Sequence, residues 1–243
     1  METKKLKKEK KEKNKLVIAI SSRALFNLDL SHQIFKDEGI EAYAKHQQEN
    51  ENVILEPGVG FTLVKKLLQL NSKKTPIDVI LLSRNSADTG LRIFNSIEHY
   101  GLNISRAAFT RGESTHPFVG AFEADLFLSS NYNDVQKALQ SGYAAASIVE
   151  SKSNNSHPSQ LRIAFDGDAV IFSDESERIF QEQGLEAFHE NEKQSENIEL
   201  KAGPFKSFLV SLQKIQSTFP EENNPIRTAL VTARSAPSHK RVI

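Results

Sequence analysis

Two aspartates separated by one glycine, Asp166-Gly167-Asp168, directly follow a short apolar run and are the residues best suited to chemistry. The first carboxylate can attack phosphorus and form an aspartyl phosphate, while the second can protonate the leaving oxygen and later deprotonate water. Gly167 removes the Cβ that would obstruct a phosphate. Like charges this close also favour a cation, normally Mg²⁺, with Asp166 and Asp168 as oxygen ligands. The alternative is a plain turn, but apolar residues follow where a turn would be polar.

A second segment, Thr232-Ala233-Arg234, supplies groups that suit a phosphate oxygen. A hydroxyl and backbone N–H groups at a strand end can hold such an oxygen, which makes Thr232 and Ala233 candidates for phosphate binding. Arg234 follows them immediately and is a candidate for substrate binding. Lys206 is a further candidate, although a lone Lys on a helix is usually only solvated.

An internal repeat positions these residues. Residues 16–70 align with residues 161–215 at a constant offset of 145 without a gap, and sixteen of the 55 pairs are identical. A four-residue insertion then moves the offset to 149. One register held over this length indicates a duplication. The pairs that matter for chemistry are Ser21 with Asp166, Arg23 with Asp168, and Ser83 with Thr232.

Each copy opens with an apolar run typical of a buried parallel strand, and helical periodicity follows it. Strands that alternate with helices predict an α/β fold, here two tandem doubly wound parallel-sheet units. In such sheets the site lies beyond the carboxyl ends of the strands, where the two aspartates fall. The expected strands are 16–20, 79–82, 124–128, 144–148, 161–165 and 228–231, and the expected helices are 31–45, 60–70, 89–100, 133–141, 176–192 and 205–217.

These motifs resemble the haloacid dehalogenase superfamily and, within it, the cytosolic type I 5'-nucleotidases. Residues 165–177 are similar to that family's nucleophile motif, and residues 203–206 and 230–235 are similar to the segments that follow it. Residues 91–97 are similar to its amino-terminal half, and the resemblance spans residues 16–243.

The resemblance implies that Asp166 is the nucleophile, Asp168 the acid and base, and Thr232 the phosphate ligand. The implied reaction is Mg²⁺-dependent hydrolysis of a nucleoside 5'-monophosphate to nucleoside and phosphate. The same resemblance calls for a Lys beside the aspartyl phosphate and an acidic pair for Mg²⁺, both after Thr232. A non-catalytic nucleotide-binding or regulatory protein, or a small-molecule phosphatase of other specificity, remains an alternative, and the preferred base and sugar stay open.

The first copy has lost the carboxylates of the motif and reads as a degenerate unit, with hydroxyls at residues 129–130 where the acidic pair belongs. Arg106 and Arg111 can bind an anion there, or are simply exposed. The second copy stops about 55 residues before the equivalent of Val149. We therefore expect a truncated, nearly inactive nucleotidase, with exposed apolar surface around Leu230 and Val231.

The expected organisation has four parts. They are a disordered Lys-rich tail at 1–15, a degenerate haloacid dehalogenase-like unit at 16–149, a linker at 150–160, and a catalytic unit at 161–243 with a small cap at about 172–224.

Composition excludes several classes of protein. The chain has no Cys, so disulfides, thiolate metal sites and Cys nucleophiles are excluded. The first fifteen residues carry eight Lys and three Glu with no apolar run behind them, which argues against a signal peptide. The remainder carries a net charge of −5, which does not favour nucleic acid as a partner. We expect a cytoplasmic protein, with no membrane partner, that can form a homo-oligomer.

Overall fold

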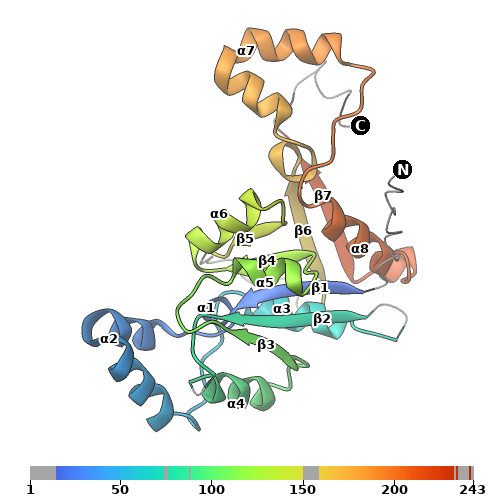
Figure 1. Cartoon of the computed structure of the whole chain (residues 1–243). Coiled ribbons are helices and arrows are strands. Elements are labelled where there is room, and N and C mark those ends of the chain that lie inside the picture. Colours follow the sequence, from blue (N-terminus) through green and yellow to red (C-terminus); the bar gives the residue numbers. More distant parts are fainter. Residues whose placement is uncertain are drawn as a thin grey trace, which may run out of the picture.

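The computed structural model describes residues 15–73, 76–87, 89–149, 159–232, 234 and 241. The first copy forms a five-stranded parallel sheet of order β3-β2-β1-β4-β5, flanked by helices (Figure 1). Its strands are β1 (Leu16–Ser21), β2 (Ile77–Ser83), β3 (Arg106–Phe109), β4 (Leu126–Ser129) and β5 (Ala145–Ser147), and its helices are α1 (Ser22–Leu25), α2 (Asp29–Glu49), α3 (Phe61–Gln69), α4 (Leu91–His99), α5 (His116–Ala121) and α6 (Tyr132–Gln140).

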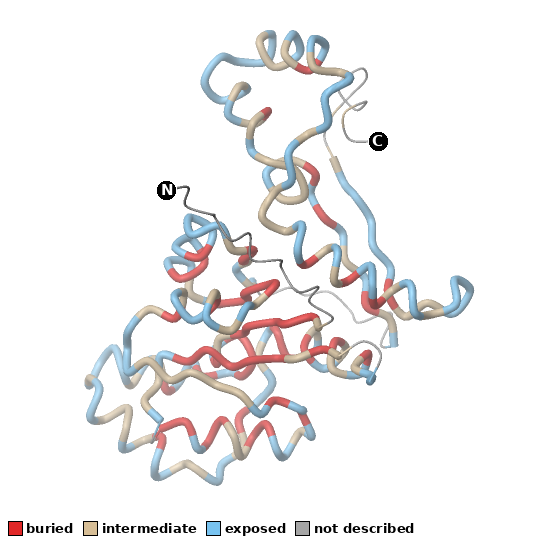
Figure 2. Tube along the Cα trace, turned by 45° about the vertical axis from the view of Figure 1, so that its right-hand side comes forward, coloured by how far each residue is buried: buried red, intermediate tan, exposed pale blue. Residues whose placement is uncertain are grey.

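Both faces of this sheet are buried. Along β1, Leu16, Ile18 and Ile20 belong to one hydrophobic cluster, while Val17 and Ala19 belong to the cluster on the opposite face. Successive side chains of a strand point to opposite faces, so a strand covered on both sides reads as a continuous apolar run. Figure 2 shows the buried residues concentrated in these strands. The predicted parallel α/β fold is confirmed.

The second copy forms a two-stranded parallel sheet. Strands β6 (Leu161–Asp166) and β7 (Ile226–Val231) pair in register, with Leu161 opposite Ile226 and Asp166 opposite Val231. A π-type turn at Gly167–Ile171 follows β6. The other elements are α7 (Glu175–Gln194), α8 (Lys206–Gln216) and a 3₁₀ turn at Glu221–Asn223.

The two copies share one core. Helix α3 of the first copy contacts β6, and the equivalent α8 of the second copy contacts β1. The Ser207 hydroxyl donates to Asp125 at 2.7 Å, and the other Asp125 oxygen accepts from the backbone N–H of Val17 at 2.9 Å. Buried residues from both copies therefore belong to the same hydrophobic cluster.

Helix α8 lies within the range that the sequence assigned to the cap, yet it packs into this core. Phe208, Leu212 and Ile215 are buried there at helical spacing. The segment that projects beyond the ends of β6 and β7 is α7 (Figure 1). Sequence analysis predicted this helix but assigned it to the cap rather than to the core, because its exposed face is polar.

The duplication is visible in the backbone. Helices α2 and α7 are both broken at a glycine with positive φ, +87° at Gly39 and +85° at Gly184, which are equivalent residues at offset 145. Isolated bridges join Phe26 to Pro57 and Phe172 to Ala202, within one residue of equivalence. Ser21 and Asp166 both end their strands, as the duplication predicts.

The predicted strands and helices are all present, with shifts of a few residues at their ends. Sequence analysis missed β3 and α5. Strand β3 is a four-residue edge strand whose residues are all half-buried. It therefore lacks the apolar run from which a buried strand is predicted. Helix α5 has only six residues, too few for helical periodicity to show.

Strand β7 is largely exposed. Only Ile226 is buried, while Leu230 and Val231 are 44% and 57% exposed, as expected from sequence. No helix among the described residues is long and apolar enough to cross a membrane. The predictions for the tail at residues 1–14 and the linker at residues 150–158 lie outside the described residues.

Candidate active site

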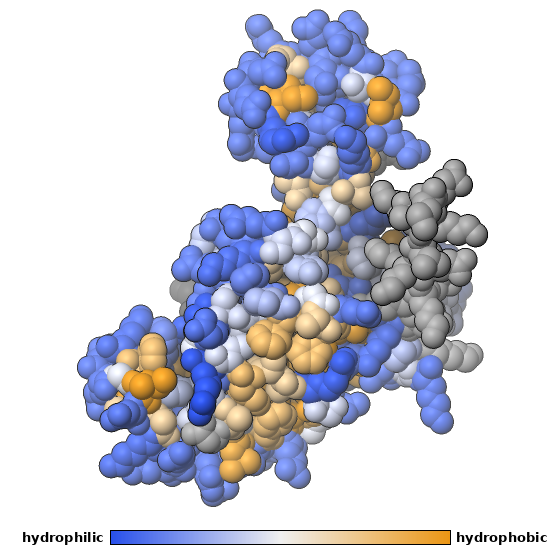
Figure 3. All heavy atoms as spheres, in the orientation of Figure 1, coloured by the Kyte–Doolittle hydropathy of each residue, from blue (hydrophilic) through white to orange (hydrophobic). Residues whose placement is uncertain are grey.

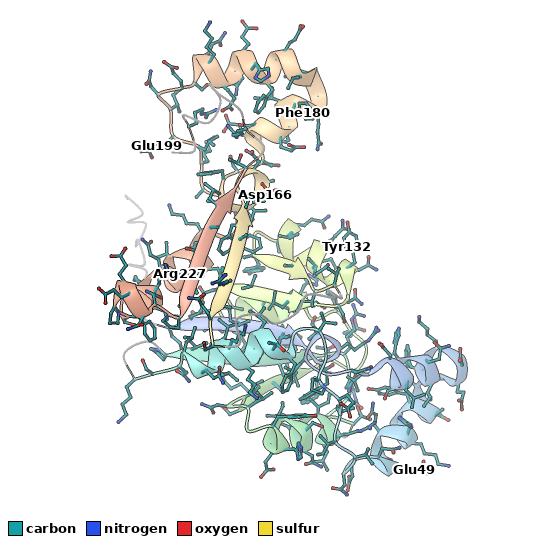
Figure 4. The ribbon with its side chains drawn as sticks, turned by 180° about the vertical axis from the view of Figure 1, so that it is seen from behind. Glu49, Tyr132, Asp166, Phe180, Glu199 and Arg227 are labelled. Carbon is teal, nitrogen blue, oxygen red and sulfur yellow. The ribbon has the colours of Figure 1, made fainter. Side chains whose placement is uncertain are left out.

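Asp166 and Thr232 lie at the same edge of the second sheet. Asp166 is the last residue of β6 and pairs with Val231, so Thr232 is the first residue beyond the neighbouring strand. A Cβ placed on Gly167 would lie 3.5 Å from the Cβ of Thr232, which shows that the two strand ends touch. Figure 4 shows Asp166 at the tip of β6, below the segment that carries Phe180.

The turn after β6 directs Asp168 away from the strand. Asp168 has extended backbone angles, whereas Ala169 adopts φ +59°, a left-handed conformation that costs a non-glycine residue about 1–2 kcal/mol. Such strained positions are often found at functional sites. Asp166 remains exposed, while the side chain of Asp168 is 24% exposed.

The partner of Asp168 is Arg234. Its Nε donates to both carboxylate oxygens of Asp168 at 3.0 Å, and its Nη2 donates to one of them at 2.5 Å. The backbone N–H of Arg234 donates to the Thr232 hydroxyl at 3.2 Å. The structure thus brings together Asp168, Thr232 and Arg234, three of the residues that the sequence predicted for the site.

A buried carboxylate, Glu192 on α7, holds the other end of Arg234. The Arg234 Nη1 donates to Glu192, and Arg241 donates to the same carboxylate at 2.8 Å. Ser176 adds a hydroxyl donor at 2.7 Å, and the Arg234 guanidinium lies 5.5 Å from the ring centre of Phe188. The side chains of Glu192 and Arg234 are 0% and 2% exposed.

Sequence reasoning missed Glu192, Arg241 and Phe188. The repeat contained a signal for them, because the first copy has Gln47, Arg92 and Tyr43 at the equivalent positions. Arg92 donates to the backbone carbonyl of Val53 and to Gln47, just as Arg241 donates to Ile198 and to Glu192. A polar pair kept in both copies, with Gln47 and Glu192 related by the offset of 145 and Arg92 and Arg241 by the offset of 149, would have marked these residues.

Neighbouring charges keep Arg234 protonated. Burial alone would lower the pKa of Arg234, but its hydrogen bonds to Asp168 and the charges of Asp168 and Glu192 outweigh burial and raise that pKa above its ordinary value. Arg234 is therefore a permanent cation that links the cap to the turn after β6. Its role as a substrate ligand stays a prediction, since both ends of the guanidinium are already engaged.

Two predicted residues remain separate from this network. Lys206 is the exposed first residue of α8, and within the described part of the chain no hydrogen bond or ion pair joins it to Asp166 or Asp168. Ala233 lies outside the described residues. The assignments of both residues to substrate binding stay predictions.

The described residues do not complete a Mg²⁺ site. Mg²⁺ prefers about six oxygen ligands in octahedral geometry, and proteins usually offer it carboxylates. Among the residues described, no group of three or more His, Asp or Glu side chains is placed to hold a metal. Asp166 and Asp168 supply two carboxylates, which fall short of six oxygen ligands, and Arg234 occupies the carboxylate of Asp168.

The first copy has a different set of groups at its strand ends. Ser21 and Ser83 replace Asp166 and Thr232, and Arg23 replaces Asp168. The carboxylate that remains there, Asp134, accepts two hydrogen bonds from Arg84 at 2.7 and 3.0 Å.

The two arginines singled out from the sequence of the first copy have different surroundings. Arg106 lies on β3, where it pairs with Asp78 and stacks over Phe122. Arg111 is exposed, with φ +50°, and lines a cavity at the strand ends.

Comparison with known proteins adds the family. A family model described as 5'-nucleotidase matches residues 8–243. The chain is 41% identical over 241 residues to human "Cytosolic 5'-nucleotidase 1B", an alignment that covers 94% of this chain and 40% of the relative. No solved structure matches. The chain thus spans less than half the length of this relative, and with nearly its whole length matched it belongs to the 5'-nucleotidase family.

Proposed function

We propose that this chain carries the nucleophile half of a cytoplasmic nucleotidase that hydrolyses nucleoside 5'-monophosphates. The family match and the printed name of the human relative support the substrate class and the location. The observation that carries the proposal is the exposed Asp166 at a parallel strand end, with the Thr232 hydroxyl at the adjoining strand end. In α/β sheets this edge is where ligands bind.

In the proposed reaction the Asp166 carboxylate attacks phosphorus, and the bond between phosphorus and the nucleoside oxygen breaks. Asp168 gives that oxygen a proton and the nucleoside leaves. A water then attacks phosphorus and gives a proton to Asp168, the bond between phosphorus and Asp166 breaks, and phosphate leaves with the Asp166 carboxylate restored. Thr232 hydrogen-bonds a phosphate oxygen. Because Arg234 holds both oxygens of Asp168, we expect the Asp168–Arg234 pair to open during turnover.

Mg²⁺ dependence is part of the proposal and rests on the family resemblance together with the paired aspartates. When bound, the cation would screen the phosphoryl charge.

The test measures phosphate release from AMP with and without Mg²⁺. Asp166→Asn should reduce phosphate release by about 10⁴-fold or more and leave AMP binding largely intact, because a lost nucleophile affects the transition state far more than the ground state. The matched control is Ser21→Ala at the equivalent strand end, which should leave turnover unchanged.

Unchanged turnover in Asp166→Asn would eliminate the mechanism. Equal turnover with and without Mg²⁺ would contradict only the proposed Mg²⁺ dependence. A panel of AMP, IMP, deoxynucleotides and sugar phosphates then separates a nucleotidase from a phosphatase of other specificity, since both would use the same aspartates. Sedimentation of the same samples tests self-association through the exposed β7.

A further inference from the structure

The first copy contains a cavity where the second has its candidate site. It has a volume of about 260 Å³ and lies at the carboxyl ends of β1, β2 and β4, with α2 as its outer wall. This size is near the lower end for small-molecule sites. A degenerate unit that served only as a scaffold would not need to keep such a cavity open.

The strand ends give the cavity a cationic floor. The cavity is lined by three arginines, Arg23, Arg84 and Arg111. Among the described residues the buried Asp134 is the one carboxylate that lines it. Asp134 is already engaged by Arg84.

The other two cations keep most of their charge available. Arg23 meets Asp29 at 3.5 Å, but Asp29 is 74% exposed, and exposed pairs of this kind are weak. No hydrogen bond or ion pair engages the Arg111 side chain in the described part of the chain. Two arginine charges therefore face the cavity without a buried counter-charge.

Hydroxyl groups surround these charges. Ser21, Ser22, Ser129 and Ser130 line the cavity at the ends of β1 and β4. Arginine and hydroxyl donors together are what a phosphate group needs. At the positions equivalent to Ser21 and Arg23 the second copy has two carboxylates, which repel a phosphate unless a cation lies between them.

The outer wall is apolar and aromatic. Phe35 and Ile40 on α2 line the cavity, although they are 45% and 62% exposed on the protein as a whole. Phe35 meets Tyr43 edge to face with ring centres 6.1 Å apart, and His32 stacks on Phe35 at 6.4 Å. Burial, and then the nearby charge of Arg23, lower the pKa of His32, so its ring is neutral at pH 7. Figure 3 shows apolar atoms gathered on the α2 lobe.

We propose that this cavity binds a phosphate ester with a flat or apolar group, of which a nucleoside monophosphate is the simplest, and does so without a divalent cation and without hydrolysing it. The phosphate meets Arg23 and Arg111 at the strand ends, and the flat group lies against Phe35 and Tyr43. No hydrolysis follows because Ser21 stands where the nucleophilic carboxylate would be. This binding does not depend on the function proposed for the second copy.

The experiment is a titration of the full chain with AMP, and separately with inorganic phosphate, by calorimetry in EDTA. The wild type should bind AMP more tightly than phosphate. Arg23→Asp should weaken AMP binding by roughly tenfold or more, the effect of losing a hydrogen bond to a charged group. Arg111→Asn should act in the same direction, and Asn tolerates the positive φ at this position, so the fold is kept. The control is Arg227→Glu, an exposed arginine of β7 far from the cavity (Figure 4), which should bind AMP like the wild type.

Hydrogen–deuterium exchange locates the bound AMP. Protection is expected at residues 129–134 and not at residues 166–172. Any of four results would overturn the proposal. The first three are no AMP binding in EDTA, unchanged binding in both arginine variants, and protection confined to residues 166–172. AMP binding no tighter than inorganic phosphate would also overturn it, because the aromatic wall would then contribute nothing. Lack of phosphate release by the second copy bears on none of these outcomes.

Discussion

The two copies have nearly the same backbone and opposite charge at their strand ends. The first copy has Ser21 and Arg23 at the positions that Asp166 and Asp168 occupy in the second copy, after equivalent strands. The first copy is complete as a sheet and has a cavity lined by cations, whereas the second has two paired strands and a pair of carboxylates. Under the two proposals above, equivalent strand ends bind an anion in the first copy and attack it in the second, and two side chains make the difference.

Helix α2 of the first copy and the equivalent helix α7, which forms the cap of the second copy, also differ in the charge of their buried residues. In α2 the neutral Gln47 faces one arginine, Arg92, while in α7 the charged Glu192 faces two, Arg234 and Arg241. The geometry is shared, but only the second copy connects its cap electrostatically to a candidate catalytic residue. The second copy thus buries a carboxylate between two arginines, whereas the buried Arg92 of the first copy donates to a backbone carbonyl and to the neutral Gln47.

Glu192→Gln gives the second copy the residue of the first and should have the largest effect on stability. It leaves two buried arginines without their carboxylate, and breaking a buried pair costs about 3–5 kcal/mol. The free energy of unfolding in urea measures this cost. Glu190→Gln is the control, because Glu190 lies on the same helix, is exposed and should change stability little. Equal values for the two variants would contradict a dependence of the cap on buried charge.

Asp134→Asn removes the buried carboxylate of the first copy and should cost about 2 kcal/mol at pH 7, since Arg84 is 39% exposed and water partly replaces its partner. Burial raises the pKa of Asp134, but hydrogen bonds from Arg84 and Ser114 outweigh it and hold that pKa below 3.8. A depressed pKa gives stability that is present above the unfolded value and lost as the pH falls through the folded value.

The difference between wild type and Asp134→Asn should therefore shrink below about pH 4, as measured by urea unfolding at several pH values. Asp174→Asn serves as the control, because Asp174 forms an exposed pair with Arg178 in the second copy and should cost little at any pH. A difference that stayed constant down to pH 2 would mean that the Asp134 pair does not stabilise the fold.

Gly39→Ala and Gly184→Ala should have the smallest effects, about 1 kcal/mol each. Nothing lies within 4 Å of a Cβ at either position, so the cost is backbone strain alone. Thermal unfolding of the two variants should show equal losses. A clear inequality would show that the kinks of α2 and α7 are not equivalent.

The sequence by itself determined the repeat and the parallel α/β fold, and it predicted the chemistry that we propose for Asp166 and Asp168. These follow from local patterns: apolar runs for strands covered on both faces, helical spacing for helices, and carboxylates placed directly after a strand. The offset of 145 also predicted which residues of the two copies correspond, and the matching kinks at Gly39 and Gly184 confirm it.

Tertiary structure alone decided the partners of those residues. Arg234 and Arg241 meet Glu192 from a distant part of the chain, and no local pattern specifies a contact between side chains 42 or 49 residues apart. Packing also placed α8 in the shared core, because its apolar face contacts the first copy. The cavity of the first copy arises in the same way, from strand ends and a kinked helix that only the folded chain brings together.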